Sequence, residues 1–113
     1  MRSRNRNNYS RQEGQSTTPR YTVVLSRAAA KDLDQLPLRL LDQLKSKHFL
    51  ALAIDPRGAG RPKKGQLAGL YGYEFGPRGG YRLLYDVLDE KRLVLIIAIG
   101  PHDQAYRRAT RRR

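Results

Sequence analysis

The chain has 113 residues, 39% of them hydrophobic, and carries 23 lysine or arginine side chains against ten acidic ones. This length fits a single domain with a small core, and the formal charge of +13 favours a polyanionic partner. The absence of cysteine excludes disulfides, thiolate zinc sites and cysteine nucleophiles, and it fits a cytoplasmic protein. No apolar run approaches the roughly 20 residues that a membrane-spanning helix needs.

The charge is concentrated at the two ends of the chain. Residues 1–20 carry a net charge of +4 and residues 107–113 carry +5, which leaves +4 for the body between them. Arginine-rich ends attract phosphate-rich partners through counterion release, without reading sequence. RNA is therefore the favoured partner. An anionic membrane is a weaker alternative, because neither end has an apolar helical face, and merely solvated ends are a further alternative.

In chain order, residues 1–19 are predicted to be a disordered basic tail, because they hold almost no large apolar side chains. Tyr21–Leu25 is rich in β-branched and aromatic residues and predicts the first strand. Ser26 is a suitable N-cap for a helix over 27–36, with apolar residues at helical spacing. Pro37 is well placed to begin a second helix, whose apolar stripe reaches Leu52.

The segment 55–65 is rich in glycine, proline and basic residues and predicts a loop. Alternating patterns over 71–75 and 81–88 predict two strands, and the apolar run 93–99 predicts a central strand. Residues 102–109 predict a short helix or an arm. The predicted fold class is α+β, in the order β-α-α-β-β-β, with a helix hairpin packed on a small, mainly antiparallel sheet. The domain spans residues 20–109, followed by a basic C-terminal tail over 110–113.

Several kinds of chemistry lack their motifs. No phosphate-binding P-loop is present, the acidic residues are too scattered for a two-metal nuclease, and two histidines without cysteine make a zinc site unfavourable. We therefore expect neither a metal nor a cofactor.

Three residues near the end of the predicted sheet form a metal-free set. Arg82 lies in a strand that otherwise has core character, and His102 and Tyr106 follow the central strand four residues apart. Cleavage of RNA without a metal needs a cation that stabilises the negative charge of the phosphorane, and side chains that accept and donate protons. An arginine, a histidine and a tyrosine together can supply both. Each also has a structural interpretation: Arg82 as a solvent-facing strand residue, and His102 and Tyr106 as packing residues. His48, on a helix stripe, is interpreted as core or edge packing.

The motifs around these residues carry a family resemblance. The segment Gly80-Tyr81-Arg82-Leu83-Leu84-Tyr85-Asp86-Val87, with residues 66–71, 99–106, 26–33 and 55–57, resembles the RelE/ParE toxin superfamily. The resemblance covers residues 21–109. It implies a type II toxin neutralised by a cognate antitoxin. In the RelE branch the toxin cuts mRNA in the ribosomal A site, using the 2′-OH as the nucleophile.

Residue by residue, the resemblance implies that Arg82 is the phosphate-stabilising strand arginine and Tyr106 the C-terminal active-site tyrosine. His102 stands where the branch has arginine or histidine. RelE has two strand lysines where this chain aligns Gly72 and Glu74. Lysines of the 55–65 loop are candidates to replace these cations, and Glu74 is a candidate base. The predicted RNA-binding residues are Arg57, Arg61, Lys63, Lys64, Arg78, Arg107 and Arg108.

The function expected from these observations is that of a type II toxin acting as a ribosome-dependent mRNA endoribonuclease. Its expected partners are an acidic antitoxin, the ribosome and mRNA, with no membrane. Two alternatives remain at this point. One is a ParE-like inhibitor of DNA gyrase without nuclease activity, because a fold does not decide function. The other is a basic RNA-binding protein without toxicity.

Overall fold

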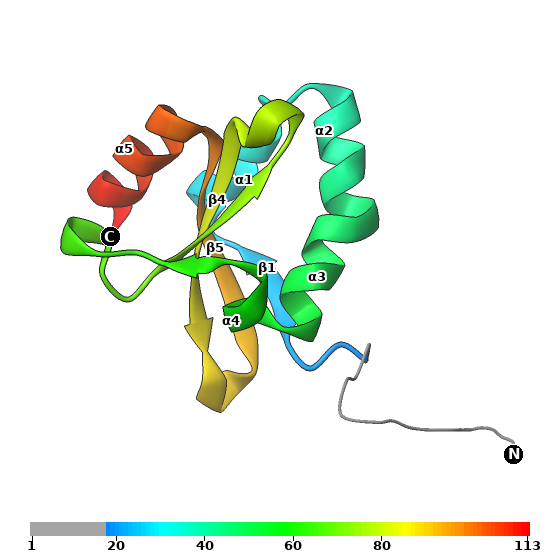
Figure 1. Ribbon diagram of the computed structural model, residues 1–113, viewed down its shortest axis with the longest axis vertical. Coiled ribbons are helices and arrows are strands. Elements are labelled where there is room, and N and C mark those ends of the chain that lie inside the picture. Colours follow the sequence, from blue (N-terminus) through cyan, green and yellow to red (C-terminus); the bar gives the residue numbers. More distant parts are fainter. Residues whose placement is uncertain (1–17) are drawn as a thin grey trace, which may run out of the picture.

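The computed structural model describes residues 18–113 (Figure 1). The predicted N-terminal tail therefore lies almost wholly outside the described residues. The strands are β1 (Thr22–Leu25), β2 (Arg61–Pro62), β3 (Tyr71–Phe75), β4 (Tyr81–Leu88) and β5 (Leu93–Pro101). The helices are α1 (Arg27–Leu33), α2 (Leu38–Gln43), α3 (Phe49–Ile54), α4 (Pro56–Ala59) and α5 (His102–Arg112).

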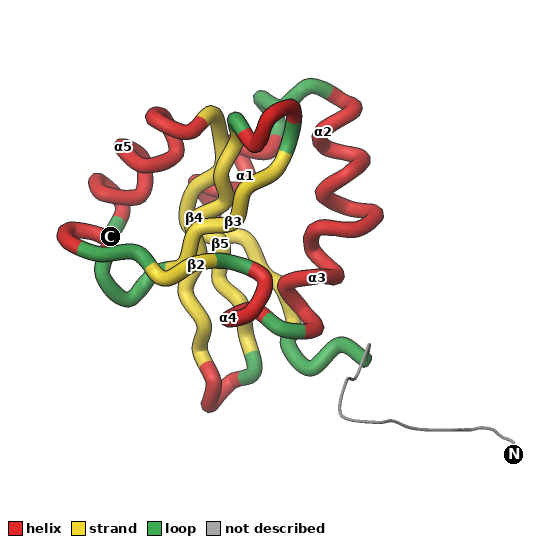
Figure 2. The backbone as a smooth tube through the Cα atoms, viewed as in Figure 1, coloured by secondary structure: helices red, strands yellow, loops and turns green. Residues whose placement is uncertain are grey.

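The five strands form one sheet in the order β1-β5-β4-β3-β2 (Figure 2). β1 pairs with β5 in parallel, and every other pair is antiparallel. The predicted α+β class and the mainly antiparallel sheet are thus confirmed. The apolar run 93–99 lies within β5, which pairs on both sides as a central strand should.

The first face of the sheet is covered by α1, α2 and α3. Ser26 caps α1 as predicted, because its hydroxyl oxygen accepts from the Ala29 N–H at 3.1 Å. α2 and α3 continue into each other through a π-helical turn over Leu44–His48. Leu44 and Leu52 from this helical unit are fully buried against the sheet. Removing either side chain would cost about 2–5 kcal/mol of folding free energy, as for other buried leucines.

The second face is covered by α5, which the sequence predicted only as a short helix or arm. Ala105 and Ala109 of α5 pack against Leu84 of β4 and Ala98 of β5. These small side chains let the helix backbone approach the sheet closely. α5 also continues to Arg112, so residues 110–112 are helical where a tail was predicted. Figure 1 shows α5 and the α2–α3 unit on opposite sides of the sheet.

The predicted loop over 55–65 contains more structure than expected. Asp55 caps the short helix α4 by accepting from the Gly58 N–H at 3.1 Å, and Pro56 occupies the first turn. The Tyr85 hydroxyl donates to the Pro56 carbonyl at 2.6 Å and ties this helix to the sheet. Arg61 and Pro62 then pair with the edge of β3. The loop prediction was wrong here: the cap at Asp55 is local, but the anchors from Tyr85 and β3 come from residues distant in the sequence.

The exposed edge of β5 is completed by side chains. β1 ends at Leu25, opposite Ile96, so beyond that point β5 has no neighbouring strand on its β1 side, while β4 still pairs with its other side. The Asp32 carboxylate accepts from the Ile99 N–H at 3.0 Å. Arg108 and Arg112 donate to the carbonyls of residues 99 and 97, at 2.6 and 3.0 Å. Because buried backbone groups need partners, these three side chains replace the missing strand and fix α5 beside β5.

Among residues 18–113, no helix is long and apolar enough to cross a membrane.

Candidate active site

Arg82 is held at the end of the sheet beneath the start of α5. It lies opposite Glu74 on β3 and Gly100 on β5. Side chains alternate along a strand, so Arg82 shares the face of Leu84, the face that α5 covers. The Arg82 guanidinium donates to the carbonyls of Gly79 and Tyr81, and only 16% of its side chain is exposed. The solvent-facing interpretation of Arg82 was therefore wrong.

Glu74 is the cross-strand partner of Arg82. Its Oε2 lies 3.4 Å from Arg82 Nη2, while 59% of the Glu74 side chain remains exposed. The Glu74 carboxylate therefore lies beside the Arg82 guanidinium and is also accessible to solvent. This arrangement suits a group that exchanges protons with a bound substrate.

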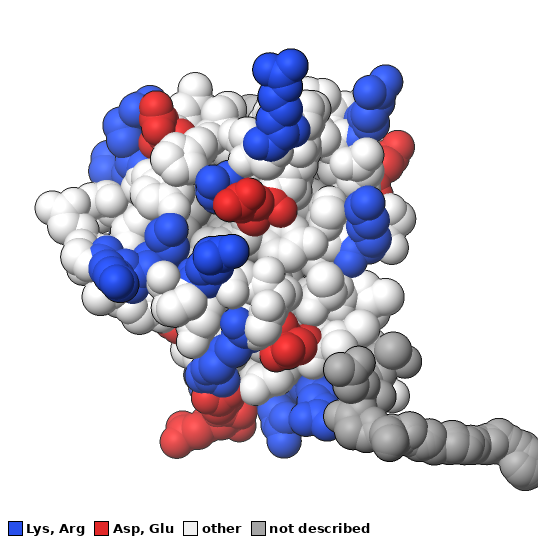
Figure 3. Space-filling view, in the orientation of Figure 1, with Lys and Arg blue, Asp and Glu red and all other residues white. Residues whose placement is uncertain are grey.

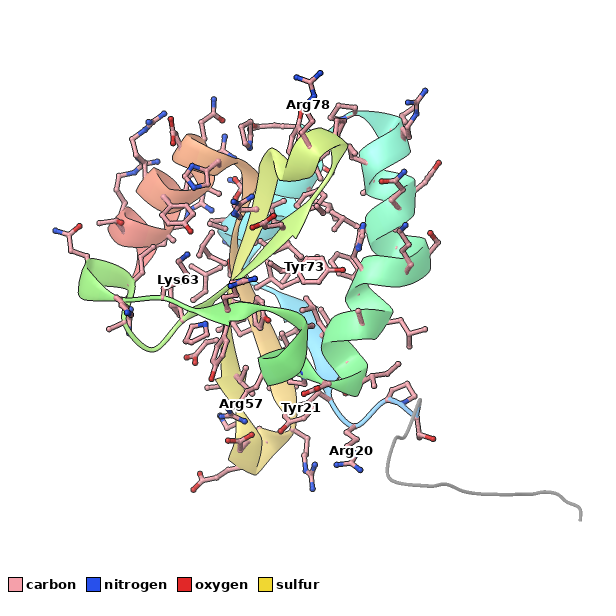
Figure 4. All side chains as sticks on the ribbon, viewed as in Figure 1. Arg20, Tyr21, Arg57, Lys63, Tyr73 and Arg78 are labelled. Carbon is pink, nitrogen blue, oxygen red and sulfur yellow. The ribbon has the colours of Figure 1, made fainter. Side chains whose placement is uncertain are left out.

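Lys63 occupies the space above Gly72. A Cβ atom added to Gly72 would lie 3.2 Å from Lys63 Cδ, closer than ordinary van der Waals contact. The glycine therefore leaves room for a lysine that arrives from the neighbouring segment. In Figure 4 Lys63 lies between the sheet and α5. A cation is thus present above the strand position where the resemblance implies a lysine, but it comes from residue 63.

A cleft of about 220 Å³ brings these groups together. It is lined by Ala59, Gly60, Arg61, Lys63, Gly72, Glu74 and Arg82. Three cations and one carboxylate converge on a space that is large enough to admit a phosphate group. A guanidinium and an ammonium on one phosphate are the arrangement that stabilises a phosphorane charge.

His102 and Tyr106 lie together on the first turns of α5. Their ring centroids are 4.6 Å apart, with an angle of 33° between the planes. The His102 N–H donates to the Gly80 carbonyl at 3.0 Å, which fixes the start of α5 beside the β3–β4 turn. His102 Nδ1 lies 2.8 Å from Asp103 Oδ1. Tyr106 in turn lies beneath Lys63, whose Nζ is 4.8 Å from the ring centroid.

A larger groove of about 580 Å³ runs beside the cleft along α5. It is lined by Lys63, Lys64, Gln66, Leu67, Tyr106, Arg107, Thr110 and Arg111. Lys63 therefore belongs to both spaces and joins Arg82 to Tyr106. In Figure 3, Lys and Arg side chains form a broken band from the segment beside α5 towards α4, with acidic side chains between them.

Three of the predicted RNA-binding residues lie apart from this site. Arg57 forms a two-point ion pair with Asp89 at 2.8 and 2.6 Å, at the far end of the molecule (Figure 4). Hydrogen bonds from Arg57 and Tyr21 lower the pKa of Asp89 to about 2. Arg78 projects into solvent from the β3–β4 turn (Figure 4), and Arg108 is committed to the β5 edge.

His48 is a packing residue, in agreement with its sequence interpretation. Its Nδ1 lies 2.6 Å from the Tyr73 hydroxyl, and its ring contacts Phe75 at a centroid distance of 5.9 Å. Its Nε2 is buried and has no hydrogen-bond partner among the described residues. Burial, assisted by the nearby Lys47 charge, lowers the pKa of His48.

The sequence analysis did not predict a structural role for Asp32, which is buried and only 3% exposed. Its carboxylate pairs with Arg112 at 2.6 Å and lies 3.4 Å from Arg108. The signal available in the sequence was an acidic residue next to Leu33 on the apolar side of a helix. It also missed Arg111 and Thr110 in the groove, because the helical register of α5 was not predicted beyond Ala109.

Among residues 18–113, no group of three His, Asp or Glu side chains is placed to hold a metal ion. The charged groups that line the cleft are three cations and one carboxylate, and the Tyr106 phenol lines the adjoining groove.

Comparison with known proteins identifies the family. Residues 23–106 match the family described as the ParE toxin of the type II toxin–antitoxin system parDE. The chain belongs to this family, within the RelE/ParE superfamily. It is 36% identical to the toxin RelG of Mycobacterium tuberculosis over 88 residues, which are 78% of this chain and 98% of RelG. It is 32% identical to the toxin RelE of the same organism over 87 residues, 77% and 87% of the two chains.

Solved structures of this superfamily share the fold. The M. tuberculosis RelBE2 toxin–antitoxin complex matches with a TM-score of 0.66 and 34% identity, over 74% of this chain and 99% of the matched one. A mutant of the Escherichia coli toxin RelE in the free state matches with a TM-score of 0.65 and 27% identity, over 81% and 96%. The resemblance noted from the sequence is thereby confirmed, and the protein is a RelE/ParE-family type II toxin.

Proposed function

We propose that this toxin is a ribosome-dependent mRNA endoribonuclease that inhibits translation in the cytoplasm. The observation that carries the proposal is the shared position of Lys63. It lines one cleft with Arg82 and Glu74, and it lies over the ring of Tyr106 in the adjoining groove. Lys63 therefore lies next to the cation Arg82 on one side and next to Tyr106, a candidate proton donor, on the other.

In the proposed reaction the 2′-oxygen of a ribonucleotide attacks the adjacent phosphorus, and the bond from phosphorus to the 5′-oxygen breaks. Glu74 accepts the proton of the 2′-hydroxyl. His102 or Tyr106 donates a proton to the departing 5′-oxygen. Arg82 and Lys63 stabilise the negative charge that develops on the phosphorane oxygens. The products are a 2′,3′-cyclic phosphate and a 5′-hydroxyl, so no water or metal enters the balance.

The ion pair between Glu74 and Arg82 gives the base its position. At 3.4 Å the carboxylate is close enough to be oriented by the guanidinium, while its exposure leaves it open to the substrate hydroxyl. A phosphate at Arg82 would therefore present its neighbouring 2′-hydroxyl to Glu74. Arg61 lines the same cleft and adds a third positive charge.

We infer further that an antitoxin with an acidic binding segment covers this surface. The RelBE2 complex and the intact E. coli RelBE complex are toxin–antitoxin assemblies with this fold. Opposed charge orients association, and the cleft and groove together present Arg61, Lys63, Lys64, Arg107 and Arg111.

The test is single-turnover cleavage of mRNA on programmed ribosomes by the purified full chain. The proposal expects cleavage within the A-site codon and a 2′,3′-cyclic phosphate at the new end. An alternative function, inhibition of DNA gyrase by binding, shares the fold and the family description. Intact mRNA together with inhibited gyrase supercoiling would replace the nuclease proposal by this alternative.

Tyr106→Phe and His102→Ala separate the two candidate acids. Loss of the phenol proton with the ring retained would slow cleavage only if Tyr106 is the donor. His102→Ala would flatten the pH dependence of the rate if the imidazole transfers the proton. Wild-type rates and pH profiles in both variants would remove this pair from the mechanism.

A further inference from the structure

Arg61 and Lys63 reach the cleft from a segment that has few backbone anchors of its own. β2 is only two residues long, and both of its residues are exposed. Arg61 pairs with Gly72 of β3, but Pro62 has no N–H to donate to a neighbouring strand. The Lys63 N–H donates to the Leu70 carbonyl at 2.9 Å. Because this edge pairing is so short, the position of the two cations depends on anchors earlier in the segment.

Tyr85 of β4 supplies a buried anchor at the start of α4. Its hydroxyl donates to the Pro56 carbonyl at 2.6 Å, and the residue is fully buried. Its ring stacks on Tyr71 of β3, with centroids 5.8 Å apart and an angle of 22° between the planes. Burial raises the pKa of Tyr85, so this hydroxyl stays protonated and able to donate. The phenol is therefore held in place and points at the α4 backbone.

The same hydroxyl also lies against the other end of α4. A Cβ atom added to Gly60 would lie 2.3 Å from the Tyr85 hydroxyl oxygen and 2.7 Å from the Gly72 carbonyl oxygen, so one of these groups would have to shift. Gly60 has a φ of −117°, which any residue adopts, so the glycine is needed for space and not for conformation. The backbone of α4 therefore folds closely around the Tyr85 hydroxyl, from Pro56 at its first residue to Gly60 just after its last.

Two further polar contacts of α4 are weaker links to the sheet. The ion pair between Arg57 and Asp89 joins side chains that are 47% and 54% exposed, and exposed pairs contribute little stability. The Asp55 cap acts within the helix itself. Tyr85 is therefore the buried polar link between α4 and the central part of the sheet.

The segment after Pro56 carries this link from one face of the sheet to the other. Ala59 packs against the core cluster that α1, α2 and α3 cover. Arg61 then passes along the edge of the sheet in β2, and Lys63 Nζ lies over the Tyr106 ring of α5 on the second face. A displacement of α4 would therefore be transmitted to the cations within a few residues.

We propose that Tyr85 is a positioning residue for the cleft. Its hydrogen bond to the Pro56 carbonyl fixes α4, and α4 sets where Arg61 and Lys63 place their charges. Tyr85 is not among the residues that line the cleft, so its effect on a bound phosphate passes through these two cations. Its role in cleavage rests on the function proposed above, whereas its role in phosphate binding does not.

The first test follows the binding of inorganic phosphate to the full chain, through the amide NMR shifts of Gly60 and Gly72 at constant ionic strength. Tyr85→Phe removes the hydroxyl and keeps the ring, and it should weaken phosphate binding. Tyr73→Phe is the matched control, because it removes a hydroxyl that lies at the same distance of 2.6 Å from its partner, His48 of the α2–α3 unit. This control should keep the wild-type affinity.

A double-mutant cycle tests whether Tyr85 acts through the cations. In a chain that already carries Arg61→Ala and Lys63→Ala, Arg82 remains to hold phosphate, and adding Tyr85→Phe should cause no further loss of affinity. A further loss as large as in the wild-type background, or an unchanged affinity in Tyr85→Phe alone, would overturn the proposal. Gly60→Ala disturbs the same contact from the α4 side and should follow the same pattern, which keeps the test decisive if Tyr85→Phe does not fold.

Cleavage on programmed ribosomes gives the second readout. Tyr85→Phe should lower the single-turnover rate at saturating ribosome by about tenfold, within the roughly 100-fold that a displacement of about 1 Å can cost. The ribosome concentration that gives half of this rate should stay at its wild-type value, and a change in that concentration alone would contradict positioning at the cleft. If the wild type does not cut mRNA, the nuclease proposal fails, while the phosphate affinities still decide the role of Tyr85.

Discussion

Arg112 Nη1 lies 2.6 Å from the buried carboxylate of Asp32, a contact that joins the last turn of α5 to α1 across 80 residues of sequence. The same carboxylate accepts from the Ile99 N–H of β5. One buried acid therefore connects the strand edge and the helix that carries His102 and Tyr106.

Asp32→Ala should lower the free energy of unfolding by about 3–5 kcal/mol, because removing one partner of a buried pair leaves charges and an N–H group unsatisfied. The measurement is urea denaturation in an Arg82→Ala background, which limits toxicity during expression. Asp34→Ala changes an exposed acid at the end of the same helix and should cost about 0.5 kcal/mol or less. Equal losses in the two variants would mean that the Asp32 network contributes nothing specific.

Arg82→Ala should slow single-turnover cleavage by about 100- to 1000-fold, with a much smaller effect on ribosome binding. The reason is that the guanidinium acts on charge present only in the transition state. Arg82→Lys should recover part of the rate, since it keeps the charge and loses the planar fork. Arg39→Ala is the control for arginine removal. A parallel loss of binding and rate in Arg82→Ala would instead make Arg82 a general RNA-binding residue.

Lys63→Ala should slow cleavage, and adding Gly72→Lys to this variant should restore part of the rate. Removing Lys63 frees the space above Gly72, so a strand lysine can bring its charge to the same place. Both variants are compared in the ribosome assay, with Lys45→Ala on the far helical unit as the control. Should Lys63→Ala cleave at the wild-type rate, the second cation must be sought elsewhere, and Arg61 is the next candidate.

Folding stability should fall as the pH drops from about 7 to 5, and His48 should account for part of that fall. Its pKa is lowered in the folded protein, so the unfolded chain binds the proton first. The stabilisation is complete above the unfolded pKa of about 6.5 and is lost as pH falls through the folded value. Urea denaturation at several pH values should show a weaker pH dependence for His48→Gln.

His102→Gln provides the comparison for this prediction, because His102 lies on the exposed start of α5. This variant should keep the wild-type pH dependence of stability. If the His48→Gln chain instead follows the wild-type curve, the acid sensitivity arises from other groups.

The sequence alone determined the elements whose signal is local. The alternating pattern around Arg82 predicted β4, Ser26 predicted the start of α1, and the apolar run of β5 predicted a central strand. Periodicity reports these features because each depends on neighbours within a few residues. The motif around Arg82 also indicated the family, and with it the fold.

Only the tertiary structure decided which charged side chains serve the fold and which line the cleft and the groove. Arg107, Arg108, Arg111 and Arg112 form one basic run in the sequence, and the register of α5 separates them into a groove pair and an edge pair. Arg57 is predicted to bind RNA, and the structure places it in an ion pair with Asp89. Such assignments depend on partners 9 to 80 residues away, and a formal charge does not reveal whether its partner is a carboxylate or a strand carbonyl.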